Sequence, residues 1–261
     1  MNTQKADRII EIIRDRGYNA ETTFKDVNGV QELGITIGDG DVRPCFYPKF
    51  DTNDYKSIAD NLIKNYEKHK DTPPILDNIA ERFTDFNYIK DNIIPCLVKE
   101  AADDVVSRNY LDLKVVYRYM IGNREASILI KKNHLDMWDI TEDELFDIAK
   151  ANVKDSFTDV GIGEMTSIPF ESMRVVTTQW NNYGASSLLF PELFEKYGND
   201  ARLLPSSIHE IIVVTADAAK DSKTKMFVDM ITSVNRTELL PQDILSDHPY
   251  AWEDGEIREV L

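Results

Sequence analysis

The spacing of apolar residues over the first seventy positions changes from helical to strand-like and back. Isoleucines at 9, 10, 12 and 13 predict a helix, which Gly17 can end because glycine tolerates a left-handed backbone. The segments that follow have the composition of strands: residues 22–27, 31–37 and 42–47. Turn signals at 28–29 and 38–40 separate them, and helical spacing returns from Ile58 to Tyr66. The predicted order is α-β-β-β-α.

The rest of the chain mixes both periods. Residues 87–106 have helical patterns, and two alternating segments, 112–120 and 126–132, predict a hairpin through the Gly122-Asn123 turn. Thr141 followed by Glu144 is a capping box that opens an amphipathic helix. Further strands are predicted at 174–178 and 207–214, and further helices at 186–197 and 222–234. We therefore predict an α+β fold, in which the larger lobe has a mostly antiparallel sheet covered by helices.

Asp71-Thr72-Pro73-Pro74 is the strongest linker signal, because consecutive prolines disfavour helix on both sides. It predicts a small lobe at 1–72 and a larger lobe at 75–261. The chain has 30 Lys and Arg against 46 Asp and Glu, a formal charge of −16. Residues 1–72 hold 13 acids and 11 bases, so most of the excess lies in the second lobe. Such a charge argues against direct binding to nucleic acid.

The composition also limits compartment and cofactors. Cys45 and Cys96 both stand in apolar surroundings and are predicted to be buried and reduced. There is no secretory signal pattern at the N-terminus and no apolar run of about 20 residues, so we expect a cytoplasmic protein with no membrane contact. Gly161-Ile162-Gly163 lacks the third glycine of a dinucleotide loop, and no cofactor is predicted.

A proline-bounded turn carries the groups that acyl transfer needs: Ser206, Ser207, His209 and Glu210. In a strand, however, His209 and Glu210 point to opposite faces, and no Gly-x-Ser-x-Gly elbow is present. A structural turn, in which the serine hydroxyls bond backbone groups, is the alternative that we favour.

A second polar turn, Ser246-Asp247-His248, adds Asp247 and His248 as candidate catalytic residues if it meets the first. Its structural alternative is a capped turn before Pro249. The histidines, at 69, 134, 209 and 248, form no zinc-binding spacing, and no metal site is predicted. The acid-x-lysine pattern Asp112-Leu113-Lys114 is typical of magnesium-dependent nucleases, but salt-bridged residues on an edge strand would have the same pattern.

A polar and aromatic loop is the main candidate for recognition of a partner. It comprises Trp180, Asn181, Asn182 and Tyr183 and is expected at the surface. Tryptophan concentrates binding energy where it is exposed, although packing into a core is its commoner role.

Several motifs in register resemble those of the bacterial family labelled domain of unknown function 5688. They are Ile128-Leu129-Ile130, Trp138, Thr141, Tyr183-Gly184-Ala185-Ser186, Leu204 to Glu210, Asn235, Thr237 and Leu245-Ser246-Asp247. The resemblance spans roughly residues 87 to 250 and implies no known activity.

The sequence favours a non-catalytic module that binds another protein, with the acidic second lobe and the Trp180 loop facing a basic partner. One version is a mimic of nucleic-acid charge, which requires one continuous carboxylate surface. The alternative is a hydrolase whose site combines the Ser206 to Glu210 and Ser246 to His248 turns. The oligomeric state is not predicted.

Overall fold

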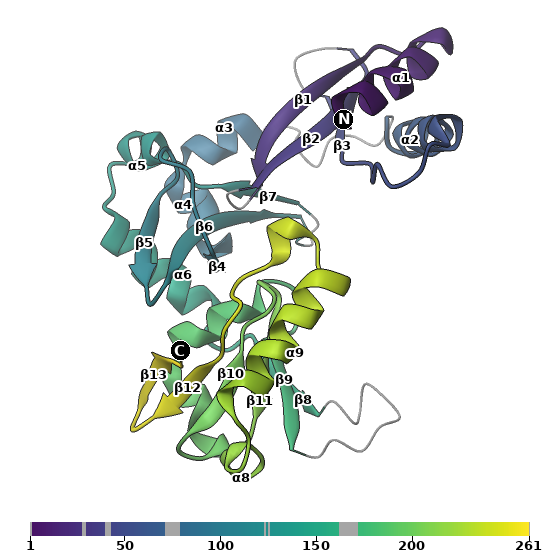
Figure 1. Ribbon diagram of the computed structural model, residues 1–261. Coiled ribbons are helices and arrows are strands. Elements are labelled where there is room, and N and C mark those ends of the chain that lie inside the picture. Colours follow the sequence, from purple (N-terminus) through teal and green to yellow (C-terminus); the bar gives the residue numbers. More distant parts are fainter. Residues whose placement is uncertain are drawn as a thin grey trace. The chain divides into compact units, whose positions relative to one another are not determined.

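The computed structural model describes residues 2–27, 30–39, 43–70, 79–122, 124, 126–161 and 172–260. The chain divides into two compact units, Met1–Ile79 and Ala80–Leu261 (Figure 1). The predicted linker at 71–74 and the turn at 28–29 lie outside the described residues, as do parts of the turns at 38–40, 122–123 and 161–163.

The first unit has the predicted α-β-β-β-α order. Its elements are α1 (Asn2–Asp15), β1 (Ala20–Val27), β2 (Val30–Ile37), β3 (Cys45–Phe46) and α2 (Tyr55–His69). The strands form an antiparallel meander in the order β1-β2-β3, and α1 packs against α2 and the sheet. Gly17 follows the end of α1, as predicted. Its φ is +86°, which glycine adopts freely but which would strain a residue with a side chain. The prediction that Cys45 is buried is wrong: β3 is an edge strand, and Cys45 is only partly buried.

The described residues of the second unit form two antiparallel sheets. Four strands form the first sheet: β4 (Ile93–Val98), β5 (Ser107–Tyr110), β6 (Leu113–Ile121) and β7 (Ala126–Leu129). The long strand β6 pairs with each of the other three. The second sheet has the order β13-β12-β10-β11-β9-β8. Its strands are β8 (Phe157–Gly161), β9 (Met173–Thr178), β10 (Ala201–Leu204), β11 (Glu210–Val214), β12 (Tyr250–Glu253) and β13 (Glu256–Glu259).

Helices cover these sheets, so the α+β class is confirmed. The α-helices are α3 (Ile79–Thr84), α4 (Phe86–Ile89), α5 (Lys132–Trp138), α6 (Glu142–Val153), α8 (Ala216–Ala219) and α9 (Thr224–Thr237). The 3-10 helices are η1 (Lys90–Asn92), η2 (Gly184–Leu189), η3 (Pro191–Tyr197) and η4 (Pro241–Asp243). Phe227 and Ile231 of α9 pack on Leu204 and Val214 of the six-stranded sheet. The fully buried η2 contacts β4, β9 and β11, and so joins the two sheets.

Three predicted elements of the second unit need correction. The helical pattern at 87–106 contains β4, an entirely buried apolar run whose periodicity does not separate helix from strand. β4 lies at the sheet edge, where its Pro95 is tolerated. The helix at 186–197 is instead η2 and η3, separated at Phe190 before Pro191. The strand predicted from Ser207 begins at Glu210, because Ser207 makes an isolated bridge to Ile244 and residues 208–209 form a bend.

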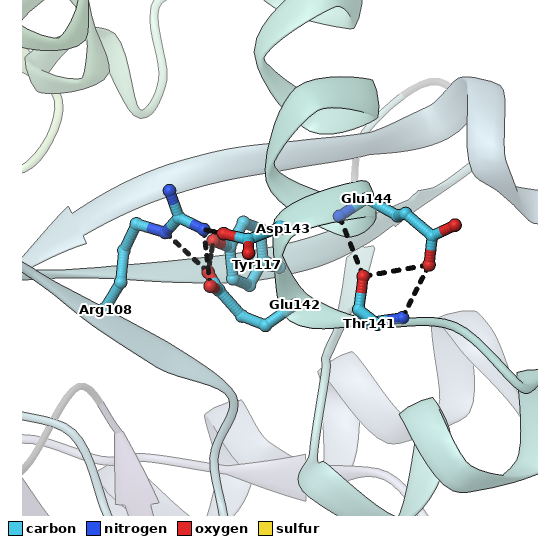
Figure 2. A network of polar contacts seen from close by, with 6 residues as sticks. All are labelled: Arg108, Tyr117, Thr141, Glu142, Asp143 and Glu144. Carbon is cyan, nitrogen blue, oxygen red and sulfur yellow. Dashed lines mark hydrogen bonds and ion pairs between the residues drawn. The ribbon is translucent and has the colours of Figure 1, made fainter.

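A satisfied polar network fixes the start of α6. Thr141 and Glu144 form the predicted capping box, in which Glu144 N donates to Thr141 Oγ1 at 3.3 Å. Arg108 of β5 donates to both Glu142 oxygens, at 2.7 and 2.5 Å, and to Asp143 (Figure 2). The hydroxyl of fully buried Tyr117 also donates to Glu142. We call Arg108, Tyr117, Glu142 and Asp143 the Glu142 network.

Candidate functional site

The Trp180 loop, residues 180–183, connects β9 to η2 and is fixed through its backbone. Thr178 Oγ1 donates to the Asn182 carbonyl at 2.7 Å, and Asn182 N donates back to Thr178 Oγ1 at 3.2 Å. Asn181 and Tyr183 both have φ of +55°, a left-handed conformation that is costly for residues other than glycine. Asn181 is exposed, and the three other side chains of the loop are half-buried.

Gly184 anchors the end of this loop. Its N–H donates to the carbonyl of His209 at 2.8 Å. A Cβ on residue 184 would lie 2.5 Å from that carbonyl oxygen and 2.5 Å from Thr177 Cα, both backbone atoms. Only glycine permits this close approach. The Trp180 loop is therefore held against the turn that carries His209.

Two arginines and a histidine gather beside the loop. The Arg124 guanidinium carbon lies 3.7 Å from the centre of the Trp180 ring, and that of Arg118 lies 5.4 Å from the Tyr183 ring. His209 also contacts Tyr183: the two ring centres lie 5.7 Å apart, and His209 Nδ1 accepts from Tyr183 N at 3.4 Å. Burial raises the pKa of Tyr183 and lowers the pKa of Arg124. The loop is thus a cationic and aromatic patch on an acidic chain.

Several buried polar atoms of this patch have no hydrogen-bond partner among the described residues: Trp180 Nε1, Asn182 Oδ1 and Arg124 Nη1. A buried polar atom that makes no hydrogen bond costs free energy, about 1–3 kcal/mol in typical cases. Such groups call for a physical reason, and one is a site that is completed by a ligand.

The structure brings the first set of candidate catalytic residues together as a packed turn. Ser206 and Ser207 are 4% and 1% exposed, and Ser207 Oγ accepts from His209 N at 3.0 Å. The His209 imidazole faces Asp243, with 3.5 Å between Nε2 and Oδ1. Burial raises the pKa of Glu210, and the nearby His209 opposes this shift. Among the described residues no serine hydroxyl bonds the His209 ring, so this geometry offers no activated nucleophile.

The second turn lies directly beside the first but has its own partners. Leu245 N donates to the Ser206 carbonyl at 2.9 Å, and Ser246 N to the Pro205 carbonyl at 3.0 Å. Asp247 faces Lys99 at 3.9 Å, whereas His248 Nε2 lies 3.1 Å from Asp112 Oδ2. The two histidines therefore contact different carboxylates.

Asp112 itself lies in the turn before β6, and the prediction that it belongs to a strand is wrong. Lys114, on β6, donates to Asn109 Oδ1 at 2.5 Å. Asp112 instead faces His248 and, with Glu259, forms a set of potential metal ligands.

Sequence reasoning found the Trp180 loop and His209 but missed Arg118, Arg124 and Asp243. These residues are distant in sequence from the loop, so their proximity depends on the fold. One available signal was Arg118, a charged residue between two tyrosines in the mostly apolar strand β6.

The chain belongs to a family of unknown function, DUF5688, whose sequence model matches residues 20–254. The match confirms the family resemblance and extends it into the first unit. Comparisons with curated proteins and with solved structures found no match. Within the described part of the chain, every helix is too short or too polar to cross a bilayer.

Proposed function

We propose that this chain is a non-catalytic binding protein and that the Trp180 loop is its recognition surface. The observation that carries the proposal is the set of partnerless polar atoms on Trp180, Asn182 and Arg124. Trp180 and Asn182 lie on a segment that is fixed by the hydrogen bonds of Thr178 and Gly184, so the loop is pre-organised. Pre-organisation lowers the entropic cost of binding.

The local chemistry favours an acidic segment of a partner protein at this surface. Arg118 and Arg124 stand beside the loop, and guanidinium groups bind carboxylates in a planar, bidentate manner. Tryptophan and arginine are also the residues most enriched at binding hot spots. The proposal thus departs from the basic partner that the net charge favoured.

Many carboxylates of the second unit already have cationic partners, which weighs against a nucleic-acid mimic. The paired acids are Asp104, Glu142, Asp143, Asp159, Asp200, Asp229, Glu253 and Glu256. A charge mimic instead needs carboxylates that present unneutralised charge to the ligand.

The test is affinity capture from cell lysate at low and high salt, with the wild type and with Trp180→Ala and Arg124→Ala. We expect an acidic partner that the wild type retains at low salt and that both variants lose. The matched control is Tyr88→Ala, which removes an exposed aromatic ring stacked 5.2 Å from the Arg82 guanidinium. Retention equal in the wild type and both loop variants would contradict the proposal.

A further inference from the structure

A second site lies where three segments of the second unit converge. Asp112 precedes β6, His248 precedes β12 and Glu259 ends β13. One ligand atom from each, two carboxylate oxygens and an imidazole nitrogen, lie within 4.8 Å of one another. None of these residues belongs to the Trp180 loop, so the site is independent of the proposed function.

The hydrogen bonds of His248 leave its Nε2 facing a carboxylate. Nδ1 lies 3.3 Å from the Pro249 carbonyl, which can only accept, so Nδ1 carries the proton in this contact. In the neutral ring Nε2 then has a lone pair, and it lies 3.1 Å from Asp112 Oδ2, a second acceptor. A proton on Nε2 makes this contact an ion pair, and a metal ion that replaced that proton would meet the same two atoms. A backbone carbonyl that orients the far nitrogen is the usual arrangement of a metal-bound histidine.

The two carboxylates add the charge that such a cation requires. Asp112 Oδ1 accepts from the Tyr250 hydroxyl at 2.5 Å, which fixes the carboxylate with Oδ2 toward His248. Glu259 lies opposite Tyr250 in the β12–β13 register and is exposed, and its carboxylate makes no ion pair or hydrogen bond with the described residues. Its side chain is free to close on an ion.

We infer that Asp112, His248 and Glu259 bind one divalent transition-metal ion, with Zn²⁺ as the representative, and leave a fourth position to water. Zn²⁺ forms bonds of about 2.0–2.2 Å to nitrogen and oxygen ligands, so the three ligand atoms need to move only slightly closer together to bind it. The ion ties the C-terminal hairpin to the turn before β6. The spacing of histidines did not predict this site, because its ligands are far apart in sequence.

The test is calorimetric titration of the full chain with zinc chloride, in a Cys45→Ser background that removes the partly exposed thiol as a competing ligand. We expect one ion per chain, at least tenfold weaker binding for His248→Ala and for Asp112→Asn, and a smaller loss for Glu259→Gln. Zinc should also raise the Tm of the parent protein but not that of His248→Ala, because an ion that binds only the folded state stabilises it.

The matched controls are Glu256→Gln and His209→Gln. The first removes an exposed carboxylate from the same hairpin, and the second removes a histidine that faces a different carboxylate. Both should bind zinc as the parent does. No uptake by the parent, or uptake unchanged in Glu259→Gln and His248→Ala, would overturn the inference. Glu259 is exposed, so its variant remains informative if His248→Ala fails to fold.

Discussion

The Glu142 network and the Trp180 loop both have arginine beside aromatic rings, but they differ in whether their buried polar groups have hydrogen-bond partners. In the network, Arg108 makes three hydrogen bonds to two carboxylates, and the Tyr117 hydroxyl donates to Glu142 (Figure 2). The Arg108 guanidinium also stacks 3.9 Å from the centre of the Phe146 ring. In the loop, Arg124 stacks as closely on Trp180, but buried atoms of both side chains lack partners. A satisfied network stabilises the fold, and we propose that the incomplete one is completed by a partner.

The largest expected effect is on stability, at the network. Glu142→Ala leaves the buried Tyr117 hydroxyl and the Arg108 guanidinium without their main acceptor, and should lower the free energy of unfolding by about 2 kcal/mol. Urea denaturation measures this change. Asp143→Ala removes the same charge from a side chain that is 89% exposed, and should cost less than about 0.5 kcal/mol. Equal costs for the two variants would mean that the network does not stabilise the fold.

Two adjacent serines that follow the loop differ in whether their buried hydroxyl has a hydrogen-bond partner. Ser186 Oγ donates to the Tyr183 carbonyl at 2.7 Å, so Ser186→Ala should cost about 1 kcal/mol. Ser187 Oγ is buried without a partner among the described residues, so Ser187→Ala should be neutral or slightly stabilising. Thermal unfolding of the two variants, which differ by one position, decides the point. A larger loss for Ser187→Ala would show that its hydroxyl is bonded in solution.

The effects of pH are expected to be smaller still, and they have opposite signs at Glu210, which follows His209, and at Glu144, in the capping box of α6. Burial raises the folded-state pKa of Glu210 above its ordinary value of 4.5. The contribution of Glu210 to stability therefore falls as the pH rises from 4.5 through the folded-state pKa. Bonds from Thr141 lower the folded-state pKa of Glu144, whose contribution is present above 4.5 and is lost as pH falls.

Tm measured from about pH 4 to about pH 8 tests both signs. Glu210→Gln should be more stable than the wild type at the upper end, and the gain should vanish at the lower end. Glu144→Gln should show a deficit at the upper end that shrinks at low pH. The same sign for both variants would contradict the difference between their surroundings.

Local patterns were enough to predict much of the fold. The meander of the first unit, the capping box at Thr141 and the helix α9 follow from alternation, turn residues and helical spacing. β4 was missed because a six-residue apolar run fits a buried helix as well as a buried strand. The C-terminal hairpin, β12 and β13, was missed because its four-residue strands carry little pattern of their own.

The candidate sites were less predictable, because their residues meet through sheet pairing. Trp180 and Tyr183 were identified as a surface loop, but Arg124 reaches them from a hairpin about sixty positions earlier in the chain. Asp112 and His248 are still further apart in sequence. No spacing rule joins such residues.

We propose that recognition and stability reside in different regions, and partner binding and urea unfolding of the same two variants test this separation. The captured partner is titrated against Trp180→Ala and Tyr117→Phe, and urea unfolding is recorded for both. We expect Trp180→Ala to lose the partner, and Tyr117→Phe to bind as the wild type does while losing about 1 kcal/mol of stability. Partner binding that survives in Trp180→Ala and fails in Tyr117→Phe would contradict the account.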